Sequence, residues 1–142
     1  MRKGLLSAVI ALALAACSGG GEAGGEGASG AEPVAASVYQ TEIAPLLANA
    51  CATCHLTGTE AGNLIMVPGR AIESLVNVAS VENGDLMRVV PGKPDESYLI
   101  MKLEGTHIAA GGAGAIMPFG APPLPAEEIA KVRRWIAEGA KP

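Results

Sequence analysis

The sequence predicts a small helical domain that follows an export signal and a glycine-rich connecting segment. Helix signals occur in three segments, at residues 38–51, 94–105 and 125–139. All four aromatic residues of the chain lie after residue 36, so a folded core is expected only in residues 37–142.

The N-terminus has the pattern of a secretory signal. Arg2 and Lys3 precede an apolar run, GLLSAVIALALAA, at residues 4–16. A charged start followed by a short apolar run is typical of exported proteins. The run is shorter than the roughly 20 residues that span a bilayer. We therefore expect residues 1–16 to be a signal peptide that is removed.

The end of that run, LAAC at residues 14–17, resembles the lipobox of bacterial lipoproteins. In that family, cleavage falls before the cysteine, which is then lipidated. The resemblance implies a lipid anchor on Cys17 at the periplasmic side of a bacterial membrane, and Ser18 favours the outer membrane. An ordinary signal peptide that ends near a cysteine is the alternative.

A low-complexity segment separates Cys17 from the domain. Residues 18–36 contain seven glycines, and glutamate is their only charged residue type. Such a segment cannot bury enough apolar surface to offset the entropy of ordering it. We expect residues 17–36 to be a lipidated cysteine with a flexible tether.

The first predicted helix lies in residues 38–51. Ser37 and Gln40 have the spacing of a capping box. Pro45 falls inside the segment and is expected to kink or restart the helix, because proline lacks the backbone N–H donor. The stretch 61–90 that follows the motif described below is apolar, and short strands are possible in part of it.

The two later helices have clearer boundaries. In the segment 94–105, Pro94 suits the first turn and Gly105 is a stop signal, with Lys102 expected at a charged edge. The segment 125–139 begins at Pro125 and ends at Gly139. The apolar stripe expected on this last helix consists of Ile129, Val132, Trp135 and Ile136.

The first helix ends in a cluster of potential ligands, Cys51, Cys54 and His55, with the spacing C-x-x-C-H. Zinc sites, redox dithiols and haem attachment sites all use these residue types. Zinc needs four ligands, and His107 is the only other histidine, at an unfamiliar spacing. A thioredoxin-like dithiol should follow a strand. The spacing matches attachment of haem c, in which two thiols bond to one porphyrin edge and the histidine binds the iron.

The opposite face of such a haem needs a sixth ligand or an open position. Met117 follows the glycine-rich run AAGGAGAI and precedes Pro118, which favours a loop that can lie across the cofactor. Met87 and Met101 are expected to serve in packing, and Met66 to pack near the haem edge if anywhere. His107 remains the alternative sixth ligand.

Together, C-x-x-C-H, the segment PGKPDESYL, the loop IMPFG and the final RRWIAEGA resemble a monohaem, class I c-type cytochrome domain, in particular the planctomycete-type subgroup. The likeness spans roughly residues 38–140. It implies an all-α fold wrapped around one covalent haem c, with the first and last helices packed together. It further implies thioether bonds to Cys51 and Cys54, and His55 and Met117 as axial iron ligands.

The function implied by this resemblance is electron transfer outside the cytoplasm, with unidentified redox proteins as partners. The alternative is a haem domain with a labile sixth ligand, acting as a ligand sensor or a peroxidase-like enzyme. Residues 37–142 carry eight Lys or Arg and eleven Asp or Glu, so no basic patch suggests nucleic acid. Arg70 is a possible partner of the haem propionates, although an exposed loop position is the expectation.

Overall fold

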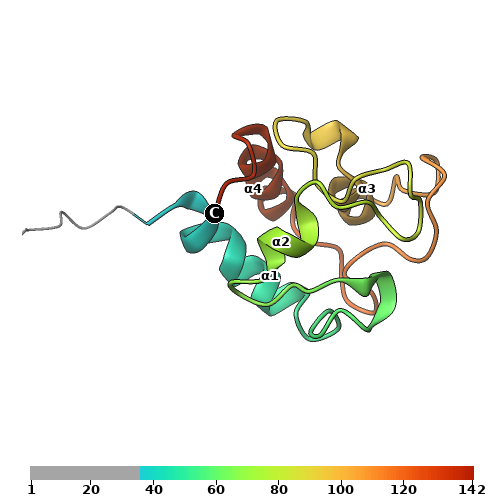
Figure 1. The fold of residues 1–142 in the computed structure, drawn as a ribbon, viewed down its shortest axis with the longest axis horizontal. Coiled ribbons are helices and arrows are strands. Elements are labelled where there is room, and N and C mark those ends of the chain that lie inside the picture. Colours follow the sequence, from blue (N-terminus) through green and yellow to red (C-terminus); the bar gives the residue numbers. More distant parts are fainter. Residues whose placement is uncertain (1–35) are drawn as a thin grey trace, which may run out of the picture. The chain divides into compact units, whose positions relative to one another are not determined.

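The computed structural model describes residues 36–142, which belong to one compact unit (Figure 1). The predicted signal peptide, Cys17 and the tether up to residue 35 lie outside the described residues. The regular elements are the π-helix η1 (Tyr39–Ile43), α1 (Ala44–Ala50), the 3-10 turn η2 (Ala61–Asn63), α2 (Ala71–Leu75), the 3-10 turn η3 (Pro94–Glu96), α3 (Tyr98–Glu104) and α4 (Ala126–Ala137). The described domain is helical, as an all-α fold requires.

The first helix begins with the predicted capping box. The backbone N–H of Ser37 donates to the Gln40 side chain at 3.1 Å, and the Gln40 N–H donates to Ser37 Oγ at 3.2 Å. Pro45 does restart the helix, because η1 is a π-helix and α1 begins directly after it with proline in its first turn. The wider π turn accommodates a residue that cannot donate to the preceding turn.

The two later helices lie close to their predicted bounds. Ser97 separates η3 from α3, which ends at Gly105 in the left-handed conformation (φ 77°) that glycine adopts readily. Helix α4 starts after Pro125 and carries two glutamates in its first turn. Its apolar stripe is buried at Val132, Trp135 and Ile136, and Ile129 packs against the core.

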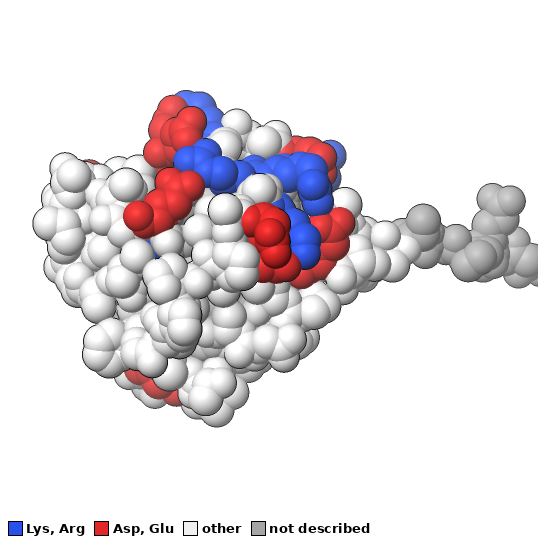
Figure 2. All heavy atoms as spheres, turned by 180° about the vertical axis from the view of Figure 1, so that it is seen from behind, with Lys and Arg blue, Asp and Glu red and all other residues white. Residues whose placement is uncertain are grey.

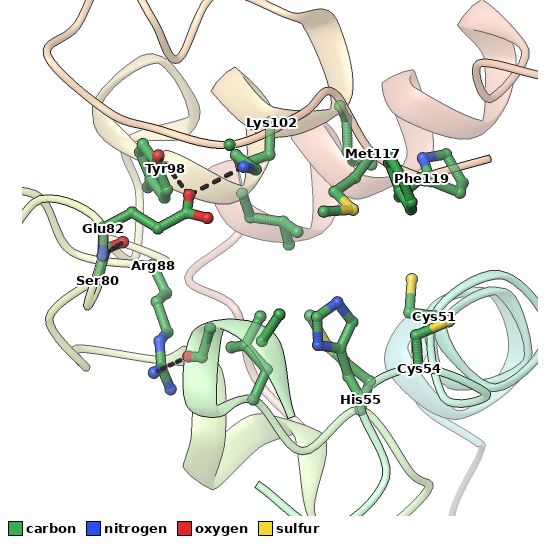
Figure 3. A pocket seen from close by; sticks show the side chains of 18 of the residues that line it. Cys51, Cys54, His55, Ser80, Glu82, Arg88, Tyr98, Lys102, Met117 and Phe119 are labelled. Carbon is green, nitrogen blue, oxygen red and sulfur yellow. Dashed lines mark hydrogen bonds and ion pairs between the residues drawn. The ribbon is translucent and has the colours of Figure 1, made fainter. Parts of the chain in front are cut away.

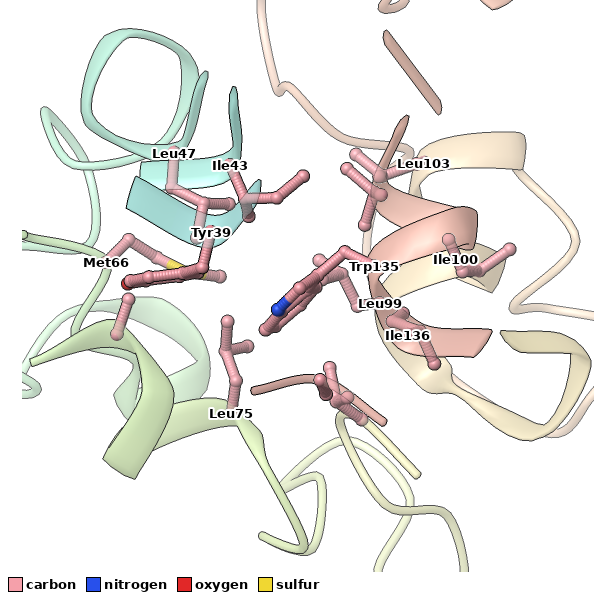
Figure 4. Close-up of a cluster of buried hydrophobic side chains, with 14 residues drawn as sticks. Tyr39, Ile43, Leu47, Met66, Leu75, Leu99, Ile100, Leu103, Trp135 and Ile136 are labelled. Carbon is pink, nitrogen blue, oxygen red and sulfur yellow. The ribbon is translucent and has the colours of Figure 1, made fainter. Parts of the chain in front are cut away.

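The hydrophobic core is centred on Trp135 (Figure 4). The ring of Tyr39 in η1 lies 5.7 Å from the Trp135 ring, centroid to centroid, and the indole N–H donates to the carbonyl oxygen of Lys141 at 2.8 Å. An ion pair of 2.8 Å between Arg134 and Glu42 joins the same two elements at the surface. The predicted packing of the first helix on the last is therefore present.

The stretch 61–90 is mostly irregular. Beyond η2 and α2, its β pairing within the described residues consists of two isolated bridges, Val76 with Val89 and Ala79 with Met87. The prediction that Met87 packs in the core is wrong, since its side chain is 39% exposed. Its neighbour Arg88 is turned inwards and is 8% exposed, because successive side chains of extended backbone point to opposite sides.

Acidic and basic side chains mix on the surface. Arg133 of α4 pairs with Glu104 of α3 at 2.8 Å and with Asp95 of η3 at 2.7 Å. Figure 2 shows the charges gathered on one part of a face that is otherwise largely uncharged, with both signs side by side. Among residues 36–142, no helix combines the length and apolar character that crossing a membrane would require.

Candidate functional site

A cavity of about 360 Å³ opens beside the end of the first helix. Cys51, Cys54 and His55 line one side of it, and Met117 and Phe119 lie across from them (Figure 3). The far end is polar. Apolar side chains, including Leu64, Met66, Leu75, Leu99 and Leu103, complete the wall. The volume lies within the range of small-molecule and cofactor sites.

The C-x-x-C-H motif forms a single turn at the end of α1. The Cys51 N–H donates to the carbonyl oxygen of Leu47 at 3.0 Å, so this residue still belongs to the helical hydrogen-bond pattern. The carbonyl oxygen of Cys51 then accepts from the N–H groups of Cys54 and His55, each at 3.1 Å. This turn brings both cysteines and the histidine to the same cavity wall.

His55 is buried, with 9% of its surface exposed. Its carbonyl oxygen accepts from the Met66 N–H at 2.8 Å, and its Nδ1 atom is buried without a hydrogen-bond partner among the described residues. Burial lowers the pKa of the imidazole. The ring is therefore held in the neutral form, which is the form that binds metals.

The two thiols differ in environment. Both are free, but Cys51 is half-buried and Cys54 is exposed. Burial, with a smaller effect of Cys54, raises the pKa of the Cys51 thiol to about 11. Cysteines of redox dithiols have a lowered pKa, because the thiolate is the nucleophile. The pKa of Cys51 is shifted in the opposite direction, and the motif follows a helix instead of a strand. This turn therefore lacks the features of a redox dithiol.

Met117 lies opposite His55 across the cavity (Figure 3). It directly follows the glycine-rich run and is joined to Pro118 by a cis peptide bond. Its N–H donates to the carbonyl oxygen of Lys102 at 3.0 Å, which ties the loop to α3. The structure thus brings together the four site residues Cys51, Cys54, His55 and Met117.

The alternative sixth ligand, His107, does not line this cavity. It is 2% exposed, and its Nε2 atom lies 3.1 Å from the carbonyl oxygen of Gly114. Met66 lines the cavity as a buried wall residue, whereas Met87 and Met101 are absent from the wall. Of the methionines in the described part of the chain, Met117 is the one that faces His55.

The polar end of the cavity contains a guanidinium group that the sequence pattern did not single out. Arg88 donates from Nη1 to the Ser74 carbonyl oxygen at 2.7 Å and from Nη2 to the Gly62 carbonyl oxygen at 2.8 Å. It makes no ion pair with any carboxylate in residues 36–142. Arg70, by contrast, is exposed, and its ion-pair partner among residues 36–142 is Glu73, one turn further along.

Lys102 is the second cation at this end, and its predicted place at a charged edge is wrong. It is 7% exposed and pairs with Glu82 at 2.9 Å, because the glycine-rich loop covers this face of α3. Burial raises the pKa of Glu82. Hydrogen bonds from Lys102 and Tyr98 and the charge of Lys102 lower this pKa by a larger amount, so the net shift is downward. The carboxylate therefore stays charged.

Within residues 36–142, no cluster of three or more His, Cys, Asp or Glu side chains is arranged to hold a metal ion. A zinc site that joins Cys51 and Cys54 to His107 is not formed, because His107 is engaged elsewhere. Comparisons of the chain with protein-family models, with curated proteins and with solved structures gave no match.

Proposed function

We propose that residues 37–142 hold one covalent haem c and act as an electron carrier outside the cytoplasm. One observation carries this proposal. A single cavity has two thiols at one end, a neutral buried imidazole on one side and a thioether on the opposite side. A haem c needs these groups in this relation, with two thioether bonds at one edge and an axial ligand on each face.

The residues of the cavity suit each part of that cofactor. Cys51 and Cys54 would form the thioether bonds, and His55 and Met117 would be the axial ligands. When bound, the haem would supply the Fe(III)/Fe(II) couple, and the protein would set its potential through the ligands and through burial. Apolar side chains such as Leu75 and Leu103 would exclude water from the ring.

The polar end also suits a haem. The two propionate carboxylates of a haem lie on the side away from its vinyl groups, hence away from the two cysteines. A buried cation without a counter-charge is unfavourable, and Arg88 has only neutral hydrogen-bond partners. We infer that a propionate would provide the missing negative charge beside Arg88.

The decisive experiment combines a test for covalent haem with optical spectra. The chain is expressed in a bacterium that attaches haem c, and the denatured protein is stained for bound haem. We expect staining, together with the weak long-wavelength band of methionine bound to ferric haem. Met117→Ala should keep the stain and lose the band. Met101→Ala, at a half-buried methionine outside the cavity, is the matched control and should keep both.

Two outcomes would contradict the proposal in different ways. Absence of covalent haem would exclude a c-type cytochrome. A haem protein without the methionine band, which binds cyanide or carbon monoxide readily, would instead favour the ligand sensor or the peroxidase-like enzyme.

We further propose that Cys17 is lipidated and that the domain works on the periplasmic side of a bacterial membrane. The lipobox-like sequence supports this part. In cell fractionation, the wild-type chain should sediment with membranes, whereas Cys17→Ser should be released into the soluble fraction. A Cys17→Ser form that stays with the membranes would refute lipid anchoring.

A further inference from the structure

The loop that carries Met117 is pinned to α3 by several hydrogen bonds. Here this loop, residues 109–118, is called the Met117 loop. Lys102 Nζ donates to the carbonyl oxygen of Ala113 at 2.9 Å, and the Ala113 N–H donates to the Tyr98 hydroxyl group at 3.2 Å. The Met117 N–H donates to the Lys102 carbonyl oxygen at 3.0 Å. The two α3 side chains that hold the loop are therefore Tyr98 and Lys102.

Both of these side chains are oriented by one carboxylate. Oε2 of Glu82 accepts from the Tyr98 hydroxyl group at 2.7 Å and from Lys102 Nζ at 2.9 Å (Figure 3). The Lys102 side chain is 9% exposed and that of Glu82 is 26% exposed. A buried ammonium group needs a counter-charge, and Glu82 is its ion-pair partner among the described residues.

Glycines in the loop allow this close approach. At Gly112, an added Cβ would collide with the Tyr98 hydroxyl group. Gly114 has a φ of +76°, and a Cβ there would lie 2.9 Å from Glu82 Oε1 and 3.2 Å from Lys102 Nζ. Glycine at these two positions thus leaves room for the side chains of Glu82, Tyr98 and Lys102. This is evidence for the close contact in addition to the hydrogen bonds.

The same segment that provides Glu82 also holds the start of the loop. Asn83 Nδ2 donates to the carbonyl oxygen of Ala110 at 3.1 Å. On the other side, the buried His107 ring contacts the carbonyl oxygen of Gly114. The loop is therefore fixed at several points between residues 110 and 117, and Glu82 is the carboxylate at the centre of these contacts.

We propose that Glu82 is a positioning residue for the sixth ligand: through Lys102 and Tyr98 it holds the Met117 loop closed over His55. This inference rests on the proposed haem site and extends it. The cluster keeps the methionine in place and small ligands out, so the domain behaves as an electron carrier. Loss of the Glu82 charge frees the loop and opens the sixth position.

The test compares full-length haem-loaded wild-type protein with Glu82→Gln and with Glu73→Gln as the matched control. Glu73 undergoes the same chemical change on the exposed side of α2, where its side chain is 76% exposed and does not line the cavity. We measure the methionine–iron band and the rate of cyanide binding. In Glu82→Gln, the band should weaken and cyanide should bind about tenfold faster, because the rate follows the fraction of open loop.

Staining for covalent haem distinguishes failure of the proposed function from failure of the inference about Glu82. Wild-type protein without bound haem overturns the proposed function, and this inference with it. Suppose that the wild-type protein holds haem and shows the methionine band. The inference alone is then overturned if Glu82→Gln matches Glu73→Gln in both the band and the rate of cyanide binding. If Glu82→Gln does not fold, Tyr98→Phe decides, because it removes only one hydroxyl group. Faster cyanide binding in Tyr98→Phe supports the inference, and an unchanged rate refutes it.

Discussion

Glu60 illustrates how a single partly exposed side chain can organise the segment that follows the cysteine motif. Its carboxylate accepts hydrogen bonds from the N–H groups of Thr57 and Gly58, each at 3.0 Å, and from the Thr57 hydroxyl group at 2.8 Å. A hydrogen bond from its own backbone N–H, followed by that from the Thr57 hydroxyl group, lowers the pKa of Glu60 from 4.5 to about 2. The charged form is therefore the one that fits the folded loop.

This lowered pKa gives a pH dependence with a definite sign. The charged Glu60 stabilises the loop above about pH 4.5, and the contribution is lost as the pH falls towards 2. The protection of the Thr57 and Gly58 amides, measured as their exchange rate relative to an unfolded chain at the same pH, should fall over this window, and Glu60→Gln should remove the dependence. Glu73→Gln serves as the control and should leave it unchanged. A Glu60 carboxyl that titrates near 4.5 in the folded protein would contradict the expectation.

Single residues also mark the limits of prediction from the sequence. Cys51, Cys54 and His55 were identifiable because they are adjacent in the chain, and Met117 because glycine and proline mark its loop. Arg88 and Glu82 carried no local signal, because their importance comes from tertiary contacts at the polar end of the cavity. Lys102 was misplaced for the same reason, since helical periodicity cannot show that a loop will cover one side of α3.

At the scale of elements, the first and last helices of the described domain pack against each other. Helix α4 buries Trp135 against Tyr39 of η1, and Trp135 is 2% exposed. Local signals predicted these helices well: the capping box of Ser37 and Gln40 is formed, and α4 has its expected apolar stripe. The π-helical start of the first helix was not predictable in detail, because Pro45 indicates a disturbance but not the hydrogen-bond pattern that accommodates it.

Trp135→Ala should therefore weaken the whole domain. Removing a buried tryptophan costs about 3–5 kcal/mol of unfolding free energy, since it loses apolar burial and leaves a cavity. Denaturant unfolding followed by circular dichroism measures this change. Ala130→Ser, on the exposed side of the same helix, is the control and should change the unfolding free energy by less than about 1 kcal/mol. An equally small effect of Trp135→Ala would contradict the central place of this residue in the core.

At the scale of the whole molecule, the domain is small and surrounds a cavity of about 360 Å³. A small domain buries only a modest fraction of its surface. A bound cofactor would add apolar contacts that the chain itself does not make, and it would stabilise the folded state that binds it. Stability and cofactor content are thus expected to change together.

Replacing both thiols tests this coupling. Cys51→Ala with Cys54→Ala should yield protein without covalent haem, whose unfolding free energy is lower by an amount comparable to the loss of a large core side chain, roughly 3–5 kcal/mol. Thermal and denaturant unfolding of the purified proteins give the comparison. Thr53→Ala changes the exposed residue between the cysteines and should behave as wild type. Equal stability of the double variant and wild type would argue against a cofactor in the cavity.

The ends of the folded unit meet beside Trp135. Ser37 and Val38 share a small surface pocket with Lys141 and Pro142, and none of these residues lines the cavity of Cys51 and Met117. Domains whose ends lie close together are easily inserted into other polypeptides. The unit is therefore suited to fusion with another polypeptide, or to repetition in series, without blocking the cavity of Cys51 and Met117. If it holds the proposed haem, each added copy would place one more electron carrier along the same chain.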